Sequence, residues 1–229
     1  MNKYFKYFMY VIDHKKRYYK FAKKQGKLKA LMHDVSKFSF AEFKPYAENF
    51  YGEKDCKKCK NYMNCDYNQI GLGSGDWAKE CKDYRYKDFD KAWEHHLLQN
   101  KHHWNYWLYD VEGYYNSPFD LESNKLDTPK DIPDEYIFEM INDWKAMADK
   151  FGDTAQEFYL KNYNKIQLSM NTRIQLEWAL GLNMSFECNY GHTIQQFVDM
   201  YDEKTFYQCV GHYIIDNYGM DMYKILKKK

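Results

Sequence analysis

Residues 133–152, PDEYIFEMINDWKAMADKFG, contain the start, the apolar stripe and the end of one helix. Pro133, Asp134 and Glu135 are typical of a helix start, and Gly152 is typical of a helix end. Between them, apolar residues recur in steps of three or four, the period of an α-helix: Ile137, Ile141, Trp144, Ala148 and Phe151. The stretch therefore predicts a helix with one buried face.

The same spacing recurs on both sides of this stretch. Helical patterns cover residues 4–25, 27–37, 41–51, 86–100, 102–110, 170–180 and 193–201, and the residues around Tyr213. Residues 111–133 contain three of the four prolines and predict a long surface connection. Because strands and helices do not alternate and no internal repeat is present, we predict an all-α fold.

Composition and length limit the class of protein. The chain has 229 residues, of which 45% are hydrophobic and 20% aromatic, enough for a sizeable core. No run of 18 apolar residues occurs, so we expect no membrane span. The first residues carry charge on both sides of a short apolar run and lack a small-residue cleavage site, so we expect a cytoplasmic protein without a secretory signal. The predicted organisation is a helical domain in residues 1–183, with an insert at 52–83, followed by a helical extension at 184–229.

Positive charge is concentrated near the beginning of the chain. The net charge is +1, but residues 1–50 contain 12 Lys and Arg against four Asp and Glu. Such an excess attracts phosphate or nucleic acid, and it is also typical of a solvated helix face. Both interpretations stay open at this point.

The insert contains four of the six cysteines. Cys56, Cys59, Cys65 and Cys81 follow the pattern C-x2-C-x5-C-x15-C. Four thiolates at such spacing can close a tetrahedral structural zinc site, and the alternative is four unrelated thiols. The GLGSG run at 71–75 lacks the lysine of a phosphate-binding loop. The two remaining cysteines, Cys188 and Cys209, are expected to be ordinary buried thiols.

Two polar residues occupy positions within apolar helix stripes. His14 lies between Val11 and Tyr18, and Asp143 lies between two methionines of its helix. A carboxylate buried without a partner costs several kcal/mol, so we expect Asp143 to be paired, protonated or bound to a cation.

The histidines add a second signal. His33 is followed directly by Asp34, and four more histidines cluster at positions 95, 96, 102 and 103. Imidazole and carboxylate together suit Mn, Fe, Co, Ni or Zn, whereas Mg and Ca prefer oxygen ligands. The pattern indicates a transition-metal centre.

The order of these residues resembles the HD-domain metal-dependent phosphohydrolase superfamily. HDVSK at 33–37 resembles the HDxxK form found in members with two metal ions. HDVSKFSFAEFKPYAENFYG, AWEHHLLQNKHHWNYW and EMINDWKAMADKFG also resemble an uncharacterised bacterial and phage-borne branch with HDxSKF and NxHHWxYW motifs. The resemblance covers roughly residues 10–180 and implies an HD-domain-like helical bundle.

The resemblance also implies a ligand set. It assigns the first metal ion to His14, His33, Asp34 and Asp143. It makes Asp34 a bridge to a second ion, which His96 and either His102 or His103 hold, and the assignment is ambiguous by one position in each doubled pair of histidines. The cofactor implied is one or two ions of Mn, Fe, Co or Ni.

Further roles follow from the same resemblance. Lys37 contacts a substrate phosphate or the metal-bound water, unless it is an exposed lysine at a helix end. Asp34 and Lys37 are thus the expected catalytic residues. Glu139 either orients a ligand histidine or lies at the surface, and we favour the surface.

The function implied is metal-dependent hydrolysis of a nucleotide or another phosphate ester. Trp104, Tyr106 and Trp107 suggest a platform for base stacking, although aromatic residues at this spacing are more often part of a core. One alternative is an HD-type di-iron oxygenase with the same ligands. An alternative of another class is a non-catalytic nucleic-acid-binding or adaptor module that uses the basic first helix and the insert.

Overall fold

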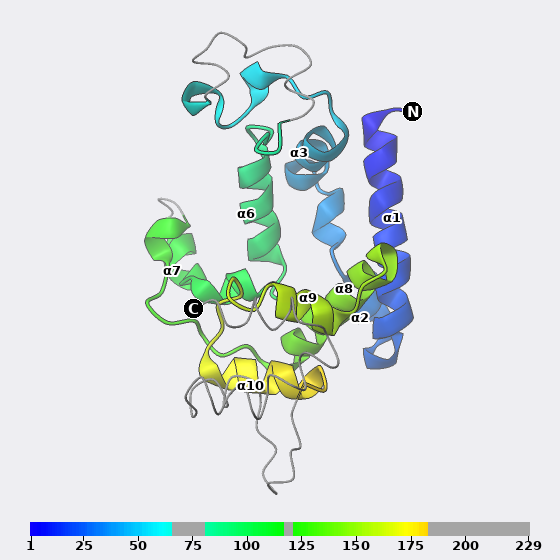
Figure 1. The fold of residues 1–229 in the computed structure, drawn as a ribbon, viewed down its shortest axis with the longest axis vertical. Helices are drawn as coiled ribbons and strands as arrows, with labels where there is room; N and C mark the ends of the chain where they lie inside the picture. The colour runs from blue at the N-terminus through cyan, green and yellow to red at the C-terminus, as the bar shows by residue number, and fades with distance from the viewer. Residues whose placement is uncertain (66–80, 117–120, 183–229) are drawn as a thin grey trace, which may run out of the picture. The chain divides into compact units, whose positions relative to one another are not determined.

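The computed structural model describes residues 1–65, 81–116 and 121–182 (Figure 1). Every regular element within these residues is helical. They also contain two isolated β-bridges, Cys59 with Tyr86 and Tyr109 with Lys125. The prediction of an all-α fold is therefore confirmed. The extension at 184–229, the helices expected at 193–201 and around Tyr213, the GLGSG run, Cys188 and Cys209 lie outside the described residues.

The helices follow the chain in a simple order. The α-helices are α1 (Lys3–Ala22), α2 (Lys27–Met32), α3 (Phe40–Tyr51), α6 (Phe89–Gln99), α7 (Val111–Asn116), α8 (Asp134–Phe151), α9 (Ala155–Lys161) and α10 (Met170–Ala179). Short 3-10 helices connect them: η1 (Lys23–Gln25), η2 (Val35–Phe38), η3 (Cys56–Lys58), η4 (Tyr62–Asn64), η5 (Trp104–Leu108) and η6 (Glu122–Asn124). None of the described helices is both long and apolar enough to cross a membrane.

The chain divides into two compact units. The first unit contains Met1–Lys16 and Leu28–Asn100, and the second contains Arg17–Lys27 and Lys101–Lys229. Helix α1 contributes to both, because its first fourteen residues belong to the first unit and its last six belong to the second.

In the first unit, α3 lies between α1 and α6 (Figure 1). Tyr7 and Val11 of α1 are fully buried against Tyr46 and Ala47 of α3, and Ala92 adds the contact from α6. The rings of Tyr7 and Tyr46 stack with centroids 5.8 Å apart. This aromatic core holds together the three helices that carry most of the polar cluster described below.

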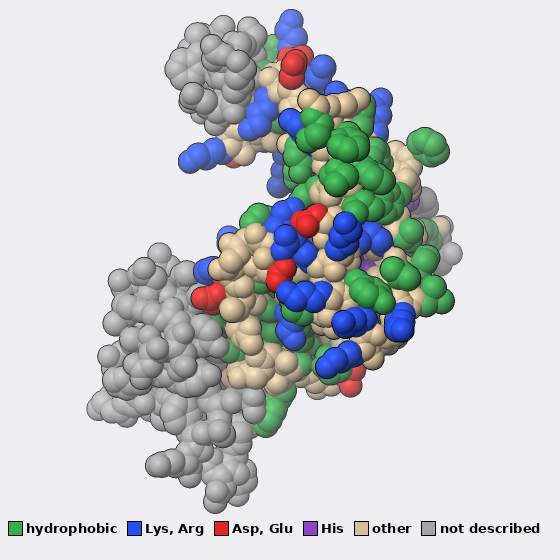
Figure 2. Space-filling model, turned by 90° about the vertical axis from the view of Figure 1, so that its right-hand side faces the viewer, with side chains coloured by type: hydrophobic (Ala, Val, Ile, Leu, Met, Phe, Trp, Pro, Cys, Tyr) green, Lys and Arg blue, Asp and Glu red, His purple; other side chains and the backbone are tan. Residues whose placement is uncertain are grey.

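Helix α1 is amphipathic, as its sequence predicts. Tyr7, Val11, His14 and Tyr18 are buried along one stripe, so the histidine does lie in an apolar surrounding. Apolar side chains are also exposed on this helix, and Figure 2, which faces the side of Figure 1 where α1 lies, shows hydrophobic side chains gathered at the surface. The exposed apolar side chains of α1 lie in its first half: Phe5, Phe8 and Met9.

The helix predicted over residues 27–37 is interrupted. Helix α2 ends at Met32, and η2 begins at Val35. Between them Asp34 adopts a left-handed backbone conformation with φ 54°, and it is the one non-glycine residue with positive φ in the described part of the chain. A continuous helix cannot contain this conformation, so the chain turns at the His33–Asp34 pair.

Residues 102–110 do not form the continuous helix that was predicted there. Helix α6 ends at Gln99, and the Asn100 side chain bonds to the carbonyl of His96 at 2.7 Å, which satisfies an end group of the helix. The chain then continues extended at His103 before the short η5 helix. His96 and His103 consequently do not share one helical face.

The second unit is built on α8. Its predicted bounds are confirmed at both ends, and Gly152 follows it with φ 77°, a conformation that favours glycine. Ile137, Ile141 and Trp144 pack in a core with residues of α9 and α10. Helix α9 was not predicted, although Thr154 and Glu157 form a capping box at its start.

The predicted connection at 111–133 contains more structure than its prolines suggest. Helix α7 and η6 lie within it, and the amide of Asp110 donates to the carbonyl of Asn124 at 2.8 Å. This segment is thus folded onto itself in part, and the predicted surface connection contains helical turns at residues 111–116 and 122–124.

One buried hydroxyl in the first unit generates a stability prediction. The Tyr7 hydroxyl is buried and has no hydrogen-bond partner among the described residues. Since an unsatisfied buried polar group is destabilising, Tyr7→Phe should raise the free energy of unfolding by about 1 kcal/mol. Urea unfolding followed by circular dichroism measures the change. Tyr4→Phe is the matched control: its hydroxyl donates to Glu48 at 2.8 Å, so this variant should lose stability. A loss for Tyr7→Phe would show that its hydroxyl is bonded.

Candidate metal centre

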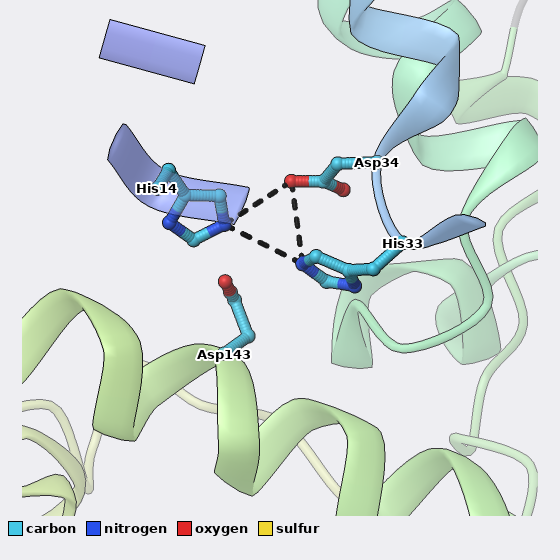
Figure 3. Close-up of side chains that lie close together, drawn as sticks. All are labelled: His14, His33, Asp34 and Asp143. Carbon is cyan, nitrogen blue, oxygen red and sulfur yellow. Dashed lines mark hydrogen bonds and ion pairs between the residues drawn. The ribbon is translucent and has the colours of Figure 1, made fainter. Parts of the chain in front are cut away.

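Three donor atoms converge inside the first unit. His14 comes from the buried stripe of α1, and His33 and Asp34 come from the turn between α2 and η2. The two Nε2 atoms lie 3.4 Å apart, and each lies 3.4 Å from Oδ2 of Asp34. Figure 3 shows these three side chains pointing toward one another. All three residues are at most 3% exposed.

The triangle formed by these three donor atoms has the dimensions of a metal site. The centre of an equilateral triangle with 3.4 Å sides lies about 2.0 Å from each corner, the length of a bond from a transition-metal ion to an imidazole nitrogen or a carboxylate oxygen. The donor set, two imidazoles and one carboxylate, suits Mn, Fe, Co, Ni or Zn. The residues present therefore fit a divalent transition-metal ion.

The left-handed conformation of Asp34 explains how neighbouring residues reach the same point. In a helix, consecutive side chains diverge by about 100°, so a histidine and the next residue would not face one donor atom. The turn at Asp34 redirects its carboxylate toward the imidazole of His33. Lys15 of α1 supports this turn, because its ammonium group donates to the carbonyl of Leu31 at 2.8 Å and to that of His33.

The second oxygen of Asp34 faces another histidine. Nε2 of His96 on α6 lies 3.5 Å from Oδ1 of Asp34, while His95 bonds elsewhere. Of the doubled histidines at 95 and 96, the structure thus brings His96 toward the carboxylate, as predicted. The two oxygens of Asp34 point to different histidines, which is the arrangement that a bridging carboxylate requires.

Glu42 is a residue of this cluster that the sequence analysis missed. Its side chain is fully buried on α3, with Oε2 2.8 Å from Nδ1 of His96 and Oε1 2.7 Å from Nδ1 of His95. A carboxylate on the far nitrogen of a ligand histidine fixes the ring and its tautomer. A signal was available, because Glu42 lies four residues before Tyr46 on the apolar face of its helix.

Lys37 belongs to the cluster as well. Its Nζ lies 2.6 Å from Oδ2 of Asp34, and its side chain is only 15% exposed. The alternative of an exposed lysine at a helix end is therefore wrong. A buried ammonium group beside a buried carboxylate compensates the charge of the carboxylate.

The surroundings shift the acid–base equilibria of the cluster. Burial would raise the pKa of the Asp34 carboxyl, but the charges of His33 and Lys37 outweigh it and hold the pKa well below 3.8. Burial lowers the pKa of His96 below 6.5, and its bond to Glu42 offsets this only in part. At neutral pH the centre therefore has an ionised carboxylate and a neutral His96 imidazole, the states in which both groups bind metals.

The other predicted ligands belong to the second unit. Asp143, also drawn in Figure 3, is a partly buried residue of α8. His102 is 3% exposed, and its Nδ1 lies 3.5 Å from Oε1 of Glu139 on α8. Glu139 was expected at the surface, but its side chain is only 13% exposed, so this expectation was wrong. His103 is partly buried, and its ring centroid lies 4.2 Å from that of His102.

The tryptophans of the predicted stacking platform pack against a hydrophobic core. Trp104 and Trp107 are partly buried and pack against the hydrophobic core of the second unit. The indole N–H of Trp107 donates to the carbonyl of Lys101 at 2.8 Å, and its ring centroid lies 5.7 Å from that of Tyr136. This packing matches the core alternative, while the assignment of Trp104 and Trp107 to substrate binding stays a prediction.

Comparison with known proteins identifies a family without assigning an activity. The model of DUF5662, described as a family of unknown function, matches residues 3–181, and the chain belongs to that family. The matched residues include the whole histidine and carboxylate cluster. No curated protein and no solved structure matches the chain.

The position of Glu42 generates a prediction on metal affinity. Glu42→Gln removes the charge that holds His96, so the affinity for Mn²⁺ should fall about 10- to 100-fold. Equilibrium dialysis with Mn²⁺ measures it. Glu48→Gln is the matched control on the same helix, because Glu48 bonds to Lys3 and Tyr4 instead and should leave the affinity unchanged. Equal affinities for both variants would contradict an orienting role of Glu42.

Proposed function

We propose that this protein is a metal-dependent phosphohydrolase that acts on a nucleotide or another phosphate ester. The observation that carries the proposal is the triangle of His14, His33 and Asp34, whose dimensions fit a transition-metal ion. His96 at the second oxygen of Asp34 supports a centre with two ions. The resemblance to the HD-domain phosphohydrolase superfamily supplies the reaction class.

We further propose, on the resemblance alone, two additions to this ligand set from the second unit. Asp143 would be a ligand of the first ion, and His102 or His103 would hold the second ion together with His96.

In this proposal each residue has a definite task. A bound divalent ion supplies Lewis acidity and lowers the pKa of a coordinated water toward neutrality. Asp34 and the histidines hold the ions, and Glu42 keeps His96 in the tautomer whose Nε2 faces Asp34. Lys37 places a positive charge beside the donors, where it attracts a phosphate group.

The alternative of a nucleic-acid-binding module receives less support. Several basic side chains of residues 1–50 are paired with groups of the protein itself. Lys3 pairs with Glu48, Lys15 bonds to carbonyl groups, and Lys37 pairs with Asp34. An oxygenase would use the same donors as a hydrolase, so the identity of the metal decides between these two: iron favours oxygen chemistry, and manganese or cobalt favours hydrolysis.

The first test removes the shared carboxylate. Asp34→Ala should lose the bound transition metal and with it the hydrolysis of phosphate esters, because every donor of the triangle faces this side chain. Elemental analysis and a panel of nucleotides and p-nitrophenyl phosphates measure both effects. Asp90→Asn, an acid that pairs with Lys60 outside the cluster, should keep metal and activity. Full metal occupancy in the Asp34 variant would refute the proposed centre.

The second test distinguishes the role of Lys37 in turnover from the role of the metal ligands. Lys37→Ala should retain the metal, because removal of a positive charge favours cation binding, while turnover falls about 100-fold through the loss of one electrostatic group. Lys44→Ala, an exposed lysine on α3, should behave as wild type. Metal content and steady-state kinetics are measured on the same preparations. Unchanged turnover in Lys37→Ala would exclude a role in substrate activation.

A further inference from the structure

The insert between α3 and α6 has little core of its own. Among its described residues, 52–65 and 81–88, the buried hydrophobic residues are Cys59 and Tyr84. Its regular elements there are η3 and η4, with three residues each, and one isolated bridge between Cys59 and Tyr86. Segments with so little apolar burial usually need a covalent or metal crosslink to hold one conformation.

Four cysteines lie in this insert, and hydrogen bonds of the main chain and of Lys54 connect their segments. Cys56 begins η3 and Cys59 follows its end, and the amide of Cys59 donates to the carbonyl of Cys56 at 3.0 Å. Cys65 follows η4 in the same way. The carbonyl of Cys81 accepts a bond of 2.9 Å from Lys54, which ties the far end of the insert to the residues just before Cys56.

The four thiols are available as ligands. All four cysteines are free, without a disulfide between them.

We propose that Cys56, Cys59, Cys65 and Cys81 bind one structural Zn²⁺ ion, independently of the histidine and carboxylate centre. Four thiolates fill the coordination of zinc, which leaves no open position for a substrate or a water molecule. The site is therefore structural. Zinc with four thiolates carries a net charge of −2. In residues 52–65, which contain three of the cysteines, four lysines against two acids give a local charge of +2 that offsets it.

The zinc ion would also fix the start of α6. The bridge between Cys59 and Tyr86 includes a bond from the amide of Lys60 to the carbonyl of Arg85 at 2.8 Å. The amide of Tyr86 in turn donates to Asn49 of α3 at 2.9 Å. A crosslink at the cysteines thus holds the residues that join α3 to α6, the helices that carry Glu42 and His96.

The test counts zinc and identifies its ligands. Asp34→Ala protein, which lacks the proposed catalytic metal, should still retain one zinc per chain after dialysis against a weak chelator. Replacement of that zinc by Co²⁺ should give the visible and near-ultraviolet absorption of a tetrahedral cobalt–thiolate centre. Cys56→Ser/Cys59→Ser should lose both the zinc and these bands. Cys188→Ser/Cys209→Ser is the matched control with the same number of thiols removed, and it should keep them.

A measurement on the unmodified chain covers the case in which the cysteine variant does not fold. With zinc bound, Cys56, Cys59, Cys65 and Cys81 should resist alkylation, and after zinc removal all four should react, as mass spectrometry of the peptides reports. Alkylation of the four thiols at the same rate with and without zinc would overturn the proposal. So would zinc loss in the Cys188→Ser/Cys209→Ser control or the absence of thiolate–cobalt bands. None of these outcomes depends on phosphohydrolase activity, which is assayed separately.

Discussion

The structure of the first unit depends on how one buried carboxylate, that of Asp34, is stabilised without water. Asp34 is 2% exposed, and an ionised carboxylate in such a place costs several kcal/mol unless charges and hydrogen-bond donors surround it. His14 of α1, His33 of the turn before η2 and His96 of α6 meet it, and Lys37 comes from η2. The left-handed backbone at Asp34 contributes to this stabilisation, because it directs the carboxylate toward these histidines and Lys37.

A second buried carboxylate extends the arrangement outward. Glu42 is fully buried and binds both His95 and His96, so that α3 and α6 are joined by charge as well as by their aromatic core. The bonds to His96 and His95 outweigh the effect of burial and lower the pKa of Glu42. The cluster therefore contains two ionised acids, and Lys37 is the permanent cation in direct contact with one of them. A divalent ion at the triangle would supply the positive charge that this balance lacks.

The fold class and much of the cluster could be predicted from the sequence, because both depend on periodicity. His14 was identifiable as a polar residue in an apolar stripe, and the bounds of α8 followed from Pro133 and Gly152. The break at Asp34 could not be predicted, since a left-handed aspartate leaves no local pattern and the tertiary contacts of its carboxylate impose it. The same holds for the burial of Glu139, which depends on His102, a residue distant in sequence.

The charges of the proposed centre constrain its substrate independently of any family resemblance. Within the first unit, one divalent ion with the ionised carboxylates of Asp34 and Glu42 and neutral histidines would have no net charge. Lys37 then makes the centre positive by one unit, and a second ion held by His96 would add two more. A buried centre with excess positive charge binds an anion far better than a neutral molecule, because the anion replaces the counter-charge that water cannot provide there. Phosphate esters carry one or two negative charges on oxygen atoms, the donors that such ions accept. If the proposed ions bind, the electrostatics of the cluster would thus favour the class of substrate proposed above.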